Sequence, residues 1–286
     1  MHYGFAFANT GPAVGGEYAI RFARAAEAAG FESLWTVEHV IWPKSYSSAY
    51  PYHPSGKMAG NHTYPIPDPL VWLTWIGAAT STIRLATGVL LLPERQPLVL
   101  AKAAATLDRL TGGRLDLGVG IGWLREEFDA LGVPFARRAA RTDEYIQVLR
   151  ALWEGNDISF DGEFIQFSGV SSNPKPKNGT VPIFIGGHSP GSARRAGRLG
   201  DGFWPVASSI DELAKLFTIV RRAAEVVGRD PADIELCASP LRGLDHAEED
   251  IAAMTELGVK RIIIPAYPFF SANPEETLGE LMGKLP

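Results

Sequence analysis

This chain has little cysteine, no excess of positive charge and no long apolar run. Its 286 residues include a single cysteine, Cys237, so no intramolecular disulfide can form and we expect a small buried side chain. The formal net charge is -5, which leaves no basic surface of the kind that nucleic-acid binding requires. No apolar run approaches the roughly 20 residues of a membrane span. The start, MHYGFAFANTG, has neither the basic nor the apolar segment of a signal peptide. We therefore expect a cytoplasmic protein that binds neither nucleic acid nor membrane.

Several catalytic motifs are missing as well. The histidines show neither H-x-H nor H-E-x-x-H spacing, so no metal site is expected. The chain has no G-x-S-x-G nucleophile elbow, which argues against a serine hydrolase. A glycosidase would need two carboxylates at strand ends, and Glu38 alone is well placed. These absences favour a protein that holds a cofactor for its chemistry.

A repeated pattern of amphipathic helix, glycine and short apolar strand predicts the fold. It reads AEAAG then FESLWTV, LDRLTGG then RLDLGVG, AGRLGDG then FWPV, and MTELGV then KRIIIPA. Glycine just past a helix end supplies a left-handed cap, and strands that are apolar throughout are typical of parallel sheets. Strands are expected at 2–8, 33–38, 83–89, 115–120, 181–186, 202–206, 234–239 and 261–266. Helices are expected at 17–29, 68–80, 97–111, 140–153, 190–199, 210–227, 246–257 and 274–284.

Eight such units without a break in composition predict a single α/β domain over residues 1–286, a (β/α)8 TIM barrel. A doubly wound open sheet is the alternative, but the first turn, ANTGPAVGG, lacks the G-x-G-x-x-G fingerprint. Two connections are long: 40–67 after strand two, and 155–180 before strand five, which contains a predicted hairpin. Insertions of this kind form lids, binding walls or packing surfaces.

The segment VPIFIGGHSPGSARRAGRLGDGFWP predicts an anion site. A strand stops at Gly186-Gly187 and a helix begins near Ser189. Glycines let the backbone approach a ligand closely, and the free amides of a first helical turn attract a phosphate. A βα turn whose glycines serve geometry alone is an equally weighted alternative.

Strand two ends in Glu38 and His39, followed by Trp42. A carboxylate, an imidazole and an indole can bind, protonate and stack against a flat heteroaromatic ligand. A partly buried Glu–His pair that closes the barrel mouth carries about the same weight. Strand four continues through Gly120, Ile121 and Gly122 to Trp123, and its glycines either clear a flat wall for a ring or fit a crowded bend.

These pieces, in this order, resemble the bacterial-luciferase-like superfamily of flavin and deazaflavin oxidoreductases. The similarity runs over most of the chain. It rests on AAEAAGFESLWTVEH, IRLATGVLLLPERQPLVLAKAAATLDRLTGGRLDLGVGIGW, RTDEYIQVLRALW and IFIGGHSPGSARRAGRLGDGFWP. The resemblance implies a (β/α)8 barrel that is often dimeric, so we expect a homodimer.

The resemblance also implies roles for residues at the strand ends. The cofactor phosphate would be bound by Gly186, Gly187, His188 and Ser189. The Gly88-Val89 bond would be the non-prolyl cis peptide that supports the central ring of the cofactor. The ring and ribityl chain would be lined by Gly120, Ile121 and Gly122.

Glu38-His39 matches the acidic residue–histidine pair of deazaflavin-using members, in which the histidine is proposed to assist hydride transfer. We expect His39 to transfer a proton and Glu38 to orient it or to bond the ring edge. Trp42 and Trp123 would wall the substrate pocket. Trp123 stands where some sugar-phosphate-oxidising members carry an acid, with Glu126 and Glu127 as loose substitutes.

The resulting hypothesis is an oxidoreductase that moves hydride between coenzyme F420 and a small organic substrate. An FMN-dependent luciferase-like monooxygenase that uses oxygen is the alternative, and a barrel that binds cofactor without turnover is a third. F420 carries an oligoglutamate tail, for which Arg194, Arg195 and Arg198 are candidates. A solvated helix face explains these arginines about equally well.

Overall fold

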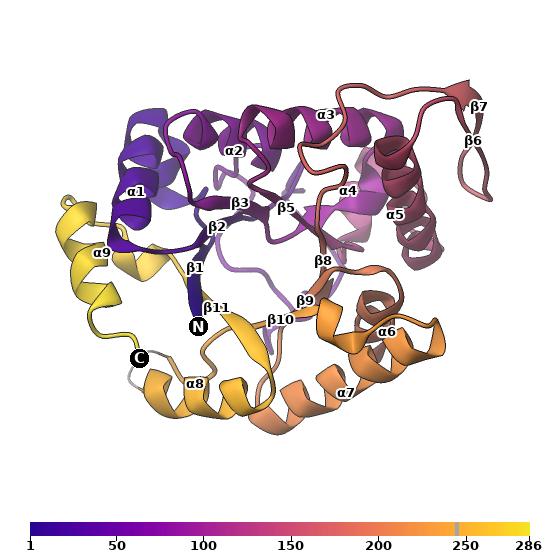
Figure 1. The fold of residues 1–286 in the computed structure, drawn as a ribbon. Coiled ribbons are helices and arrows are strands. Elements are labelled where there is room, and N and C mark those ends of the chain that lie inside the picture. Colours follow the sequence, from indigo (N-terminus) through magenta and orange to yellow (C-terminus); the bar gives the residue numbers. More distant parts are fainter. Residues whose placement is uncertain (244–245) are drawn as a thin grey trace.

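The computed structural model describes residues 1–243 and 246–286, and within them eight parallel strands form a closed barrel (Figure 1). The strands are β1 (His2–Ala6), β2 (Ser33–Thr36), β3 (Arg84–Thr87), β5 (Leu115–Gly120), β8 (Ile183–Gly187), β9 (Gly202–Pro205), β10 (Glu235–Ala238) and β11 (Val259–Pro265). Pairing of β1 with β11 and of β3 with β5 closes the cylinder. The predicted (β/α)8 barrel is confirmed and the open-sheet alternative is wrong.

Strand three is shorter than predicted. The expected strand 83–89 ends at Thr87, and the Gly88–Val89 peptide that follows is cis. The chain then re-forms a short ninth strand, β4 (Leu90–Leu91), which pairs with the end of β5. The barrel wall is therefore interrupted at its C-terminal rim, where barrel enzymes hold their active sites.

Helices surround the barrel at the predicted places. They are α1 (Gly16–Ala29), α2 (Pro69–Gly77), α3 (Pro97–Leu110), α5 (Arg138–Glu154), α6 (Pro190–Leu199), α7 (Ile210–Val226), α8 (Ala247–Glu256) and α9 (Pro274–Met282). Gly30 ends α1 in the left-handed conformation (φ 90°) that the helix–glycine–strand pattern predicts. A short helix, α4 (Arg125–Ala130), and the 3-10 turns η1 (Gly11–Val14), η2 (Leu92–Glu94), η3 (Pro231–Asp233) and η5 (Tyr267–Phe269) were not expected. Among the described helices, none combines the length and apolarity needed to span a bilayer.

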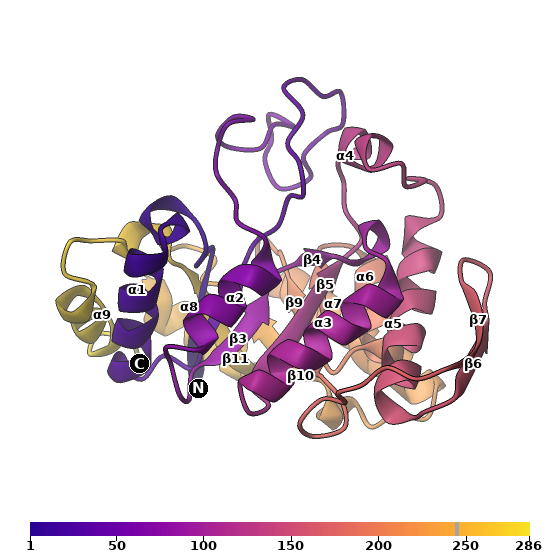
Figure 2. The same cartoon turned by 90° about the horizontal axis from the view of Figure 1, so that it is seen from above.

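The two insertions lie in different places. Residues 40–67 contain no regular helix or strand and rise above the barrel mouth beside α4 (Figure 2). The second insertion contains the predicted hairpin, formed by β6 (Ile158–Asp161) and β7 (Gln166–Val170), which projects outside α5 (Figure 1). The first insertion can therefore contact a ligand at the mouth.

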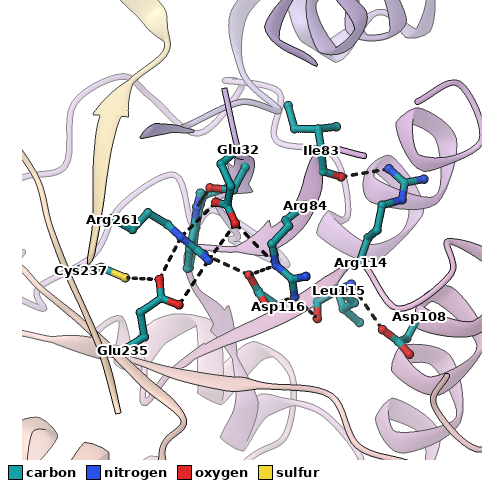
Figure 3. Close-up of polar contacts among 12 residues, drawn as sticks. Glu32, Ile83, Arg84, Asp108, Arg114, Leu115, Asp116, Glu235, Cys237 and Arg261 are labelled. Carbon is teal, nitrogen blue, oxygen red and sulfur yellow. Dashed lines mark hydrogen bonds and ion pairs between the residues drawn. The ribbon is translucent and has the colours of Figure 1, made fainter. Parts of the chain in front are cut away.

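The N-terminal end of the barrel interior is filled by an ionic cluster (Figure 3). The Arg261 guanidinium is 3% exposed and lies 3.0 Å from Asp116, 3.0 Å from Glu235 and 3.1 Å from Glu32. Arg84 also pairs with Asp116. Above this cluster the interior is apolar, with the fully buried Cys237 and rings such as Trp35 and Phe184, as the sequence predicts for the cysteine. The filled floor leaves the opposite end of the barrel for ligands.

Replacing Arg261 by leucine should destabilise the protein strongly. The buried carboxylate of Asp116 and the partly exposed carboxylate of Glu235 would lose their shared cation, and removing one partner of a buried ion pair typically costs about 3–5 kcal/mol. Arg21→Leu is the matched control, because it removes an arginine whose ion pair with Glu275 lies at the surface. Urea unfolding measures both variants, and equal unfolding midpoints for the two would contradict the role of the cluster.

Candidate active site

The side chain of Val89 fills a gap between the ends of β5 and β8 at the barrel mouth. The bond before it is cis, as the resemblance implies. A Cβ atom on Gly120 would lie 2.6 Å from Val89 Cγ2, and one on Gly186 would lie 2.4 Å from Val89 Cγ1. Val89 itself remains half-buried. The missing side chain of Gly120 thus makes room for Val89, and the expectation that Gly120 clears a wall for a ring stays a prediction.

At Gly118 and Gly122 the chain requires glycine, because a side chain at either position would clash with its neighbours. A Cβ on Gly118 would lie 1.8 Å from the Thr87 carbonyl oxygen, so β3 and β5 can approach only if residue 118 is glycine. Gly122 has φ of +73°, and a Cβ there would lie 2.7 Å from the ring of Phe128. Crowding thus explains why residues 118 and 122 are glycines. Ile121, between the end of β5 and Gly122, is half-buried.

His39 is held by a carboxylate that the sequence did not single out as its partner. Its Nδ1 lies 2.7 Å from Oε2 of Glu127, a fully buried residue on α4. The other Glu127 oxygen accepts the amide of Ile41 at 3.2 Å. Because an ionised carboxylate only accepts, Nδ1 carries the hydrogen and Nε2 is the nitrogen left to exchange a proton with a ligand.

The expectation that Glu38 orients His39 is wrong. Glu38 accepts the Leu91 amide at 2.6 Å and forms an ion pair with Arg95, which also binds Asp68 at 2.8 Å. Burial is the largest influence on the Glu38 carboxyl and raises its pKa, although Arg95 and the Leu91 amide oppose this. Glu38 therefore fixes β4 beside the Gly88–Val89 peptide and does not contact the imidazole.

Aromatic rings extend from His39 across the mouth. The rings of Trp42 and Trp123 lie 6.1 Å and 6.0 Å from the imidazole, which places both predicted wall residues beside His39. Tyr50 packs edge-on against Trp123 at 5.1 Å. Tyr52 packs on Tyr50 at 5.3 Å and on the His188 ring at 5.1 Å. Insertion 40–67 thus spans the mouth between His39 and the predicted phosphate turn.

Insertion 40–67 is fastened to α4 by the carboxylate of Glu126. Ser47 donates its amide at 2.6 Å and its hydroxyl at 2.9 Å, while Ser48 donates its amide at 3.2 Å and its hydroxyl at 2.7 Å. These hydrogen bonds outweigh the opposing effect of burial and lower the pKa of Glu126 to about 2. Adjacent residues of α4 therefore hold the insertion and His39.

The predicted phosphate turn lies at the same rim as His39. β8 ends at Gly187, where φ is +141°, and Ser189 caps α6. The Ser189 hydroxyl accepts the Ser192 amide at 3.2 Å, and the Ser192 hydroxyl accepts the Ser189 amide at 3.1 Å. Because residue 190 is proline, the Gly191 amide is the first-turn donor that this capping box does not use.

The arginines of α6 do not form the predicted rim for a polyanionic tail. Arg195 is buried and forms an ion pair with Asp143 of α5, and it also donates to the Ala139 carbonyl at 3.0 Å. Arg198 binds the same Asp143 carboxylate at 2.7 Å. Arg194 is exposed, and it is the one candidate of the three that Asp143 does not engage.

Comparison with known proteins supplies the family. A family model described as luciferase-like monooxygenase matches residues 3–279. The chain belongs to this family. An uncharacterized protein of Mycobacterium tuberculosis, Rv0940c, is 34% identical over 90% of this chain and 87% of its own length. An F420-dependent glucose-6-phosphate dehydrogenase of Mycolicibacterium fortuitum is 35% identical over 76% of this chain and 61% of its own length.

Solved structures agree on the fold. The monooxygenase RslO1 from Streptomyces bottropensis is 26% identical, with a TM-score of 0.74 over 99% of this chain and 97% of its own. The coenzyme F420-dependent tetrahydromethanopterin reductase from Methanopyrus kandleri has a TM-score of 0.77 at 16% identity, over 99% and 98% of the two chains. Family and relatives together support an oxidoreductase that uses a deazaflavin or a flavin.

Replacing Glu126 by glutamine should loosen insertion 40–67. The amides of Ser47 and Ser48 would lose a charged acceptor, so their hydrogen exchange should rise by about tenfold or more. In the wild type the contact is complete above the ordinary carboxyl pKa of 4.5 and is lost as the pH falls toward about 2, because the folded pKa is lowered. Asp129→Asn, at an exposed position of the same helix, is the control. Unchanged exchange at 47–48 in Glu126→Gln would contradict the anchor.

Proposed function

We propose that this protein transfers hydride between coenzyme F420 and a small organic substrate at the barrel mouth. The observation that carries the proposal is the position of His39. Its imidazole is held 2.7 Å from buried Glu127 at the same rim as the turn from Gly187 to Gly191. A residue able to move a proton and a turn able to hold a phosphate thus face one opening.

The residues at the mouth fit a flat, phosphate-bearing cofactor. The Val89 side chain, seated between Gly120 and Gly186, offers an apolar surface for a ring. A Cβ on Gly187 would lie 2.8 Å from Ser192, so this tight turn requires glycine. The amides of His188 and Gly191 and the hydroxyl of Ser189 are the donors proposed for the phosphate. A bound deazaflavin would supply the hydride chemistry, which the side chains at the mouth cannot perform.

Residues of the chain, His39 and Glu127, would supply or accept the proton of the reaction and orient the group that carries it. His39 would exchange it through Nε2, while Glu127 keeps the ring in one tautomer and one orientation. Glu38 would act indirectly, through the ion pair with Arg95 that fixes β4. Trp42 and Trp123 would exclude water from the reacting atoms and form the wall against which the substrate lies.

An FMN-dependent monooxygenase is the second candidate. The α6 arginines favour it, because Arg195 and Arg198 are engaged by Asp143 and cannot both serve an oligoglutamate tail. FMN has the phosphate and the flat ring without that tail. The similarity to monooxygenase RslO1 also supports this candidate.

We further propose that residues 1–286 act as one catalytic domain and that the protein is a homodimer. The support for a dimer is a set of exposed apolar side chains on α2 and α3, where Val71 is 71%, Trp75 54% and Val99 67% exposed. Sedimentation analysis measures the oligomeric state, and a monomer at all concentrations would contradict the dimer.

Cofactor titration of the wild type and of His39→Ala tests the proposal. Fluorescence quenching should show tighter binding of F420 than of FMN to both proteins. The affinities of the wild type and of His39→Ala should be similar, because His39 is not a proposed phosphate ligand. His39→Ala should lose about 10²–10⁴-fold in the rate of hydride transfer to the acceptor that the wild type reduces. His2→Ala, at the exposed first residue of β1, is the control.

Each other outcome decides between the hypotheses. Tighter binding of FMN would support the monooxygenase, and binding without turnover of any acceptor would support a carrier. Loss of cofactor affinity in His39→Ala equal to its loss of rate would contradict the proposed proton-transfer role.

A further inference from the structure

One buried side chain, that of Asn9, holds the chain just before insertion 40–67 begins and again where it ends. Asn9 lies on the loop that follows β1 and is fully buried. Its Oδ1 accepts the Val37 amide at 2.9 Å, and its Nδ2 donates to the Val37 carbonyl at 2.9 Å and to the Pro67 carbonyl at 3.3 Å. Val37 lies two residues before His39, whereas Pro67 is the last residue of the insertion. A single side-chain amide therefore closes the neck of this long loop.

The chemistry of these three contacts specifies asparagine at position 9. β2 ends at Thr36, so the amide and the carbonyl of Val37 lie beyond the strand and need partners of their own. A side-chain amide has two donor hydrogens and an acceptor oxygen, and Asn9 uses all of them. An ionised aspartate could not donate to the two carbonyls, and a leucine of similar size could neither donate nor accept. A substitution at Asn9 would therefore leave backbone groups without partners.

The segment that Asn9 holds leads directly to His39. At its other end, the carboxylate of Glu127 binds the imidazole Nδ1 at 2.7 Å and the Ile41 amide at 3.2 Å. His39 thus lies between two fixed points, which are the Val37 backbone on the β1 side and the Glu127 carboxylate on α4. Because a hydrogen bond weakens outside about 2.7–3.2 Å, displacement of the Val37 backbone would weaken the contact between His39 and Glu127.

We propose that Asn9 is a positioning residue for His39, which acts by fixing the Val37 backbone from the loop after β1. Through its bond to Pro67, the same side chain keeps the end of insertion 40–67 beside its beginning. The insertion and the imidazole therefore share one support. Asn9 exchanges no proton itself. The inference rests on the proposed function, since it takes His39 as the proton-transfer residue.

Nitrogen-15 NMR of the imidazole tests the proposal in the full-length protein without cofactor, at a pH where the ring is neutral. The His39 signals, assigned by their loss in His39→Gln, should show the hydrogen on Nδ1 in the wild type, because buried Glu127 accepts it. In Asn9→Leu the ratio of the Nδ1–H to the Nε2–H form should fall by about fivefold or more. It should be kept in Thr10→Val, the matched control, which removes a buried hydroxyl that donates to the Phe7 carbonyl at 2.8 Å in the same loop.

Two outcomes of this experiment would overturn the proposal. One is an identical tautomer ratio of His39 in the wild type and in folded Asn9→Leu. The other is an equal fall of the ratio in Asn9→Leu and Thr10→Val, which would show that any loss of a buried hydrogen bond in this loop has the same effect.

A second measurement keeps the test valid if Asn9→Leu does not fold. Hydrogen exchange of the side-chain amide in the wild type should be about tenfold or more slower at Asn9 than at exposed Asn61, since two carbonyls accept the Asn9 hydrogens. Equal exchange at the two amides would overturn the proposal. Both experiments omit the cofactor, so failure of F420 binding would reject the proposed function and leave the coupling of Asn9 to His39 intact.

Discussion

The mouth of this barrel depends on the packing of one side chain, that of Val89, into the space left by two glycines. β3 ends at Thr87, and the Val89 methyl groups enter the space beside Gly120 and Gly186. β4 pairs with the end of β5, and β5 pairs with β8, so Val89 lies where these strands meet. The turn from Gly187 to Gly191 and His39 lie at the same rim.

Charged side chains on α4 and on the loop after β2 hold the other parts of the barrel mouth in place. One turn of α4 contributes Glu126, which fastens insertion 40–67, and Glu127, which fastens His39. Glu38, paired with Arg95, fixes β4 through the amide of Leu91. Insertion 40–67, His39 and β4 are therefore held by a small set of carboxylates, so a change in the charge of one affects the others.

Much of the fold could be predicted from the sequence, because glycine caps and uniformly apolar strands have local causes. The site was less predictable. Glu38 and His39 are adjacent, but neighbouring residues of an extended chain point in opposite directions, so they could not both face the mouth. That alternation was the available signal that His39 needs another partner. Glu127 follows 88 residues later on a short helix that no periodic pattern marked, and the pairing of Arg195 with Asp143 is equally non-local.

A double-mutant cycle on Val89 and Gly186 tests the central claim most directly. Gly186→Ala should destabilise the protein by about 1–3 kcal/mol through overpacking, and adding Val89→Ala should restore the stability by vacating the gap. Cofactor affinity is measured in the same proteins. It should be lower in the double variant than in the wild type, because the apolar surface formed by the Val89 side chain is gone. A Gly186→Ala protein as stable as the wild type, or a Val89→Ala protein that binds cofactor as tightly, would contradict this account.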